Sequence, residues 1–126
     1  MKTLKAGIAS YDEMKARTMR IARGEQAVAA DDPTVWFVST ASFAKLLSAA
    51  NRELLHVIAE QAPGSLEELA RITGRQKSNL SRTLHRLESC GLIRMQRGAQ
   101  NRLVPRPVAD RIELALPLTR PALAAE

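Results

Sequence analysis

The chemistry that this sequence offers is non-covalent contact with a polyanion, made by basic side chains interspersed with small polar ones. Residues 71–106 contain nine basic residues and one acidic residue, Glu88, which gives this segment a net charge of +8. The whole chain of 126 residues carries +6, so the remainder is slightly acidic. Charge that is clustered in this way favours binding to phosphate groups over a basic surface that is merely solvated.

One predicted helix, over about residues 76–89, carries most of these side chains. Leu80, Leu84 and Leu87 recur at spacings of four and three residues, which is the pattern of one buried stripe. The opposite side of the helix then faces outward, with basic residues for guanine edges or phosphates and small hydroxyl residues that allow close approach. The candidate DNA-binding residues of this helix are Lys77, Ser78, Asn79, Ser81, Arg82, His85 and Arg86.

A shorter predicted helix precedes this one along the chain. Ser65 and Glu68 have the spacing of a capping box, which marks its start. Ala70 is small enough for two helices to approach closely, and Gly74 can adopt the positive φ that a tight turn needs. The two helices together predict a helix-turn-helix, and Arg75 in the turn is a further candidate DNA contact.

A basic β-hairpin is predicted after the second helix, over about residues 94–106. Residues 93–96 alternate between apolar and polar, residues 98–101 form a turn, and residues 102–108 return as a second strand. Pro105 and Pro107 cannot donate hydrogen bonds to a neighbouring strand, so this strand is an edge strand or is kinked. A basic hairpin tip beside a recognition helix is a wing, and its candidate DNA contacts are Arg97, Gln100, Asn101 and Arg102.

The run LEELARITGRQKSNLSRTLHRLESCGLI with the hairpin after it resembles the winged helix-turn-helix of MarR-like bacterial and archaeal transcriptional regulators. The similarity covers about residues 50–116, and its motifs fall on Leu69-Ala70, Gly74, Ser78-Asn79, Ser81-Arg82, Leu84, Leu87-Glu88 and Gly91-Leu92-Ile93. The flanking pieces VWFVSTASFAKLLSAANRELL and RPVADRIELALPL are similar to a subset of small regulators described as predicted antitoxins.

The chain departs from larger MarR proteins because it is short and no long C-terminal dimerisation helix follows the wing. Dimerisation would therefore use the N-terminal helix or the region around a short strand at Trp36. The resemblance implies a repressor that binds double-stranded DNA as a homodimer.

The first part of the chain predicts a helical extension. Ser10 and Glu13 form a second capping-box pattern, and the helix that follows runs to about residue 22, with Met14, Thr18 and Ile21 on one face. Its basic residues either are solvated and keep the helix soluble or extend the phosphate-binding surface; they are Arg17, Arg20 and Arg23. Residues 2–9 form a strand or an arm. We therefore expect a mainly α (α+β) fold, a winged helix-turn-helix over residues 34–117 with an N-terminal helical extension over residues 1–33 and a flexible tail over residues 118–126.

Catalytic, metal and cofactor sites are not indicated. The sequence contains no glycine-rich phosphate loop and no nucleophile or metalloprotease motif, so we expect no enzymatic activity and no cofactor. His56 and His85 have no further ligands at metal-binding spacing. Cys90 fits a small packing residue, and the alternative is a redox sensor whose thiol is activated by Arg86 and Arg94. The single cysteine and the lack of a signal peptide or membrane span favour a cytoplasmic protein.

Two other functions compete with a simple repressor. In the first, the chain is an antitoxin that binds a protein toxin and represses its own operon. In the second, it binds RNA, which is disfavoured because Tyr11, Trp36, Phe37 and Phe43 all lie outside the basic segment, where they cannot stack on bases.

Overall fold

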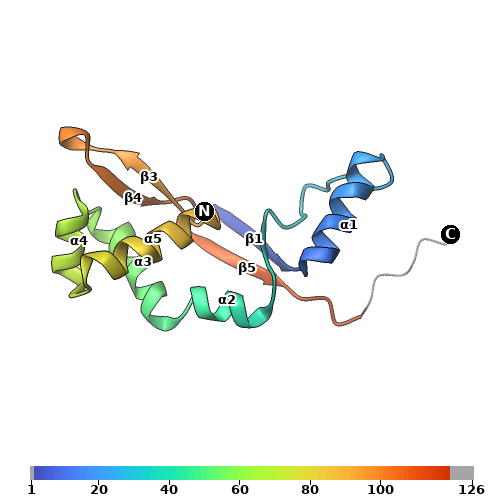
Figure 1. Cartoon of the computed structure of the whole chain (residues 1–126), viewed down its shortest axis with the longest axis horizontal. Coiled ribbons are helices and arrows are strands. Elements are labelled where there is room, and N and C mark those ends of the chain that lie inside the picture. Colours follow the sequence, from blue (N-terminus) through green and yellow to red (C-terminus); the bar gives the residue numbers. More distant parts are fainter. Residues whose placement is uncertain (1, 120–126) are drawn as a thin grey trace.

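The computed structural model describes residues 2–119 and is built from helices, a three-stranded sheet and a separate hairpin. The order of elements is β1 (Thr3–Ile8), α1 (Tyr11–Ala22), β2 (Val35–Phe37), α2 (Thr40–Leu46), α3 (Ala49–Gln61), α4 (Leu66–Thr73), α5 (Lys77–Ser89), β3 (Ile93–Arg97), η1 (Ala99–Asn101), β4 (Leu103–Pro107) and β5 (Arg111–Ala115). Helices α3, α4 and α5 and the β3–β4 hairpin lie at one end of the molecule, and α1 lies at the other end (Figure 1). The expected α+β winged helix-turn-helix is confirmed.

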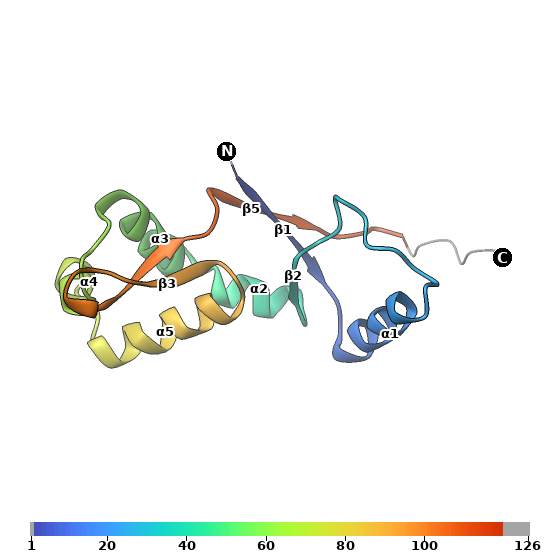
Figure 2. The same ribbon diagram turned by 90° about the horizontal axis from the view of Figure 1, so that it is seen from above.

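The sheet joins the two ends of the molecule. Its strand order is β2-β1-β5, and both pairings are parallel. β1 is therefore the central strand, although it belongs to the segment that the sequence assigned to an N-terminal extension. Seen from above, the sheet lies between α1 and the group of helices α3, α4 and α5 (Figure 2). The domain boundaries at residues 33 and 117 stay predictions, and residues 120–126 of the predicted tail lie outside the described residues.

Two adjoining apolar clusters form the core. The larger one buries nine residues of the helices and of the segment after α5, and the smaller one buries residues of β1 and β2. Leu4, Phe43, Leu46, Cys90 and Ile112 pack against both clusters, so the sheet and the helices share a continuous interior. The nine residues of the larger cluster are Leu47, Leu54, Ile58, Leu69, Leu80, Leu84, Leu87, Leu92 and Ile93.

The helix boundaries follow local signals in the sequence. Ser10 and Glu13 form a complete capping box at α1, as predicted. The second predicted capping box is wrong in one half: Ser65 accepts a hydrogen bond from the Glu68 amide, but the Glu68 carboxylate accepts from Gly64 rather than from Ser65. Because the carboxylate reaches one residue further back, it fixes the chain that leads into α4.

Helix α1 is joined to the sheet through one aromatic side chain. Trp36 lies against Gly7, where an added Cβ atom would come within 2.6 Å of the Trp36 ring. The Arg17 guanidinium lies 5.3 Å from the centre of that ring and 3.3 Å from the Asp32 carboxylate. The prediction that Arg17 is a solvated helix residue is therefore wrong, because a cation–π contact and an ion pair hold it against the sheet.

Candidate nucleic-acid interface

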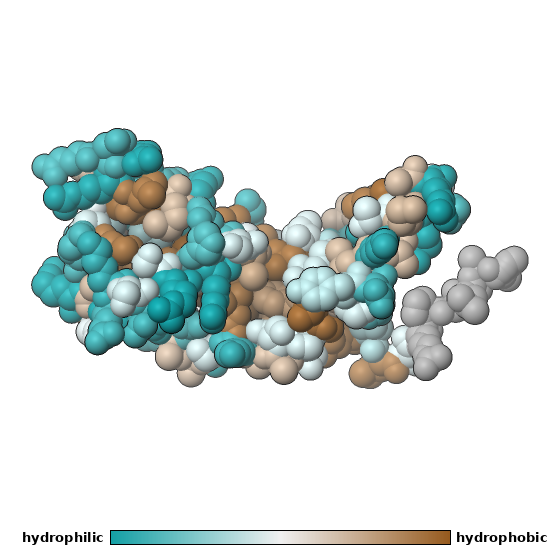
Figure 3. Space-filling view, in the orientation of Figure 1, coloured by the Kyte–Doolittle hydropathy of each residue, from teal (hydrophilic) through white to brown (hydrophobic). Residues whose placement is uncertain are grey.

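The outward side of α5 carries the polar residues that the sequence predicted. Leu80, Leu84 and Leu87 are at most 2% exposed and hold one side of the helix against α3 and α4. The predicted contacts of this helix are all exposed, at Lys77, Ser78, Asn79, Ser81, Arg82, His85 and Arg86. The space-filling view shows hydrophilic side chains gathered over α4, α5 and the hairpin (Figure 3). An exposed polar helix face of this kind has the dimensions and donors to enter a major groove.

The turn between α4 and α5 is set by a glycine and an arginine. Gly74 adopts φ 72°, the left-handed conformation expected of it. Arg75 then turns back to the start of α3, where its Nη1 donates to Asn51 Oδ1 at 3.1 Å and its Nη2 donates to the Ala50 carbonyl at 2.8 Å. Asn51 in turn donates to the carbonyl of Leu46 at 2.9 Å. The guanidinium of Arg75 is thus bonded to the start of α3, and these bonds position the turn that leads into α5.

The hairpin tip is a compact turn with unusual backbone angles. Gln100 and Asn101 adopt φ values of 57° and 61°, and Arg97 donates from Nη1 to the Asn101 carbonyl at 3.0 Å. Arg97, Gln100, Asn101 and Arg102 are all exposed. Asn is one of the residues that tolerate the left-handed conformation best, so the tip keeps a defined shape. The prediction of a basic turn between two antiparallel strands is confirmed.

The prolines of β4 occupy positions where they cost no hydrogen bond. The Val108 amide donates to the Leu92 carbonyl, and the Gly98 amide donates to the Arg102 carbonyl. These two pairs, and every second pair between them, are therefore the hydrogen-bonded pairs of the hairpin. Pro105 lies opposite Met95 and Pro107 lies opposite Ile93, in the alternate positions that point away from β3. β4 is therefore an edge strand, as expected, and the backbone nitrogens of its prolines point away from β3, although the Pro105 ring is buried.

The hairpin and the two helices of the helix-turn-helix meet around one acidic residue that the sequence did not single out. A depression between them is lined by Ser65, Leu66, Glu67, Lys77, Arg97, Arg102 and Leu103. Glu67 accepts a hydrogen bond from Lys77, which holds the pKa of the Glu67 carboxyl below its ordinary value. The sequence signal was weak because Glu67 lies outside the basic segment and joins it only in three dimensions.

The cysteine and the two histidines are the other side chains with chemistry of their own. Cys90 packs against both apolar clusters, as expected of a small packing residue. Burial raises the pKa of its thiol, which disfavours the alternative that Arg86 and Arg94 activate it. His56 and His85 are both exposed. Within residues 2–119, no group of three His, Cys, Asp or Glu side chains is placed to hold a metal ion. In the same part of the chain, no helix has the length and apolar character needed to cross a membrane.

Replacing Arg75 with alanine should lower the free energy of unfolding by about 1 kcal/mol, because two partly exposed hydrogen bonds to Asn51 and Ala50 are lost. Arg82→Ala is the matched control and should change it by no more than about 0.5 kcal/mol, because Arg82 is exposed. Urea denaturation of the two variants measures the difference. Equal stabilities would show that the Arg75 contacts do not hold the turn.

Comparison with known proteins gives a family and a related structure. The chain is similar to the crystal structure of a predicted DNA-binding transcriptional regulator from E. coli, with 29% identity over 75% of this chain and 84% of that chain and a TM-score of 0.44. No curated protein sequence matched the chain. The model of the HVO_A0114 family matches residues 46–114, which is more than half of the chain and includes α3, α4, α5, the hairpin and most of β5. The protein therefore belongs to the HVO_A0114 family.

Proposed function

We propose that this protein is a transcriptional regulator that binds double-stranded DNA in a sequence-specific manner, acting in the cytoplasm as a homodimeric repressor. The observation that supports it best is the two-sided character of α5. One side is buried by Leu80, Leu84 and Leu87, and the other side exposes hydroxyl and basic groups beside a basic hairpin.

In this proposal α5 enters the major groove. The helix has 13 residues, a length of about 20 Å at 1.5 Å per residue. Arg82 would pair with a guanine edge, and Ser78 and Ser81 would let the helix backbone approach the bases closely. Lys77, Asn79, His85 and Arg86 lie around them and would contact adjoining bases or phosphates. Bound at a promoter, such a dimer represses transcription by occupying the site.

The wing would hold the DNA backbone. Arg97 and Arg102 lie on the two strands next to the turn, and Gln100 and Asn101 lie at its tip. Contacts of this kind fix the position of the protein on the duplex and contribute affinity without reading the sequence. Arg75 is not needed for this role, because its guanidinium already bonds to Asn51 and Ala50.

The placement of the aromatic residues supports duplex DNA over single-stranded RNA. Phe37 is buried and makes an edge-to-face contact with Phe43 at 5.0 Å between ring centres. Trp36 is covered by Arg17. Tyr11 is exposed, but it lies on α1, at the other end of the molecule from α5 (Figure 1). The basic surface therefore has no aromatic side chain of the described residues on which bases could stack.

Arg82→Ala and Arg102→Ala should separate base reading from backbone binding. With operators selected from a random pool of duplexes, Arg82→Ala should lose about 1–3 kcal/mol of binding to the selected sequence and little to unselected DNA. Arg102→Ala should weaken both about equally and flatten the dependence of log K on log salt by about one unit. Titrations by fluorescence anisotropy at several salt concentrations measure both effects. Unchanged binding by Arg82→Ala would remove α5 from the interface.

Glu67→Gln should strengthen DNA binding. Lys77 is now paired with Glu67, and the variant would free it for a phosphate while removing a negative charge near Arg102. We expect affinity at low salt to rise roughly twofold to fivefold and the salt dependence to become steeper. Glu53→Gln is the matched control, because it removes the same charge from α3, where Glu53 pairs with His56. Equal gains in the two variants would mean that only net charge matters.

An antitoxin role is a second candidate, and the exposure of α1 favours it. No residue of α1 is buried, and Tyr11 and Met19 are 80% and 44% exposed. An exposed amphipathic helix at the end of a fold suits the apolar groove of a partner protein, here a toxin. The same chain could then bind DNA through α5 and its partner through α1.

Substitutions test this role better than truncation. Removing residues 1–33 would delete β1, the central strand of the sheet, and would damage the whole fold. Tyr11→Ser with Met19→Ser should instead abolish co-purification with a toxin expressed from a neighbouring gene and leave DNA affinity unchanged. A complex that survives both substitutions would exclude α1 as the binding surface.

A further inference from the structure

The outer edge of β5 carries backbone groups with no partner strand among residues 2–119. The Thr34 amide donates to the Lys5 carbonyl, and the Ala9 amide donates to the Phe37 carbonyl. The backbone N–H and C=O groups of the odd-numbered residues of β1 therefore point to β2, and those of the even-numbered residues point to β5. The register places Thr3 beside Arg111. In a parallel pair with this register, the odd-numbered residues of β5 bond to β1. The N–H and C=O groups of Ile112 and Leu114 therefore point to the free edge.

The free edge of β5 lacks a feature that the edge strand β4 of the hairpin has. On β4 the residues whose backbone groups point away from β3 are Pro105 and Pro107, and neither has an N–H group. On β5 the residues whose backbone groups point to the free edge are Ile112 and Leu114, and both have an N–H group. Folded proteins generally protect an edge strand with proline, lysine or a bulge, because an open edge pairs with another strand. The β5 edge is therefore open to pairing with another strand.

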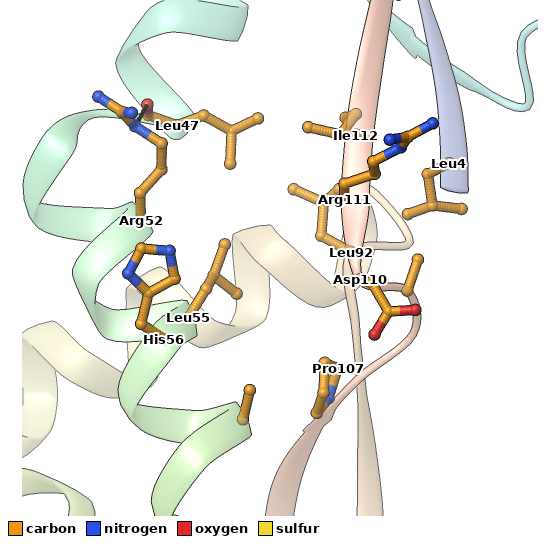
Figure 4. Close-up of a pocket in the computed structure, with 12 residues that line it drawn as sticks. Leu4, Leu47, Arg52, Leu55, His56, Leu92, Pro107, Asp110, Arg111 and Ile112 are labelled. Atoms are coloured by element: carbon orange, nitrogen blue, oxygen red, sulfur yellow. Dashed lines mark hydrogen bonds between the residues drawn. The ribbon is translucent and has the colours of Figure 1, made fainter. Parts of the chain in front are cut away.

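An apolar groove lies directly beside this edge. It has a volume of about 330 Å³ and separates β5 from α3. Leu47, Leu55 and Ile112 face it from opposite sides, with Leu4 and Leu92 behind them (Figure 4). A strand added at the edge would lie along the mouth of this groove and cover Leu55 and Ile112, which are only partly buried.

We propose that the occupant of this edge is β5 of a second copy of the chain, paired antiparallel across a two-fold axis at Ile112. Arg111 then lies opposite the partner's Glu113, and Glu113 lies opposite the partner's Arg111. Ile112 exchanges two backbone hydrogen bonds with the partner's Ile112, and the two isoleucine side chains meet on the groove side. The two sheets join into one sheet of six strands. This surface differs from the N-terminal helix and the Trp36 region that the sequence suggested for dimerisation.

The charges select this register over its neighbours. Arg111 and Glu113 lie on the face of the sheet away from the core, where Arg111 Nη2 is now 3.7 Å from Glu113 Oε2 of its own strand. An axis at Glu113 would set two carboxylates opposite each other, and an axis at Arg111 would set two guanidiniums opposite each other. Like charges in directly opposed positions destabilise a strand pair, whereas opposite charges stabilise it. The axis at Ile112 alone gives two pairs of opposite charge.

Charge reversal tests the pairing. Arg111→Glu leaves two acids on the strand, and Glu113→Arg leaves two basic residues, one of them beside Lys5. Each variant alone should dimerise at least about tenfold more weakly than the wild type in sedimentation equilibrium. An equimolar mixture should form a heterodimer, because both opposed positions then hold opposite charges. Wild-type affinity in either single variant, or no heterodimer in the mixture, would overturn the proposal.

Disulfide trapping tests the register in a Cys90→Ala background. Residues 111 and 113 of the two copies should form a pair without backbone hydrogen bonds, with Cα atoms about 4.5 Å apart, which permits a disulfide. Mixed Arg111→Cys and Glu113→Cys chains should cross-link on mild oxidation, and Glu113→Cys chains alone should not. Efficient self-linking of Glu113→Cys would place the axis at Glu113 and refute the pairing.

The dimer serves the proposed function, because it would present two copies of α5 to two half-sites, but it is measured without DNA. A wild-type protein that dimerises but does not bind DNA would support the β5 pairing and refute the proposed function. DNA binding by a chain that stays monomeric with and without DNA would refute the β5 pairing and the homodimer, and would leave the proposed DNA binding through α5 supported. Loss of the dimer in Met19→Ser, with the charge-reversal variants unaffected, would place the interface on α1 instead of β5.

Discussion

The burial of three leucines on α5 is the constraint on which the candidate interface depends. Leu80, Leu84 and Leu87 fit between α3 and α4, and their burial fixes the rotation of α5 about its own axis. A rotation by one residue, about 100° in a helix, would expose a leucine and bury a charged or hydroxyl group. The identity of the exposed face therefore follows from packing, and the polar residues on it contribute nothing to holding it there. This separation leaves those residues free to be selected for binding.

The helix-turn-helix was predictable because its signals are local. The leucine spacing, the glycine at position 74 and the serine cap at position 65 each act within a few residues of themselves, and the structure places them as expected. The hairpin was predictable for the same reason, since its turn and alternating strands are contiguous. Even the prolines of β4 indicated an edge strand, although the sequence did not show that they point away from β3.

The parts that sequence reasoning missed depend on contacts between distant residues. Nothing near β1 in the sequence shows that it lies between β2 and β5, because parallel pairing leaves no turn to mark it. Arg75 and Arg17 had the appearance of free surface charges until the chain brought Asn51 and Trp36 to them. Folding likewise places Glu67 beside the basic residues Lys77, Arg97 and Arg102. In each case the charge was visible in the sequence and its partner was not.

The central position of β1 has a consequence for how the chain assembles. Thr3 pairs with Arg111, so the sheet encloses nearly the entire described chain between its first and last strands. Closing so long a loop costs entropy before any contact repays it, whereas α3, α4, α5 and the hairpin are contiguous. On a ribosome the contacts within the helix-turn-helix can therefore form before β5 completes the sheet. A nascent chain would hold β1 unpaired on the β5 side until residue 115 emerges, which makes that strand the point where synthesis is most exposed to misassembly.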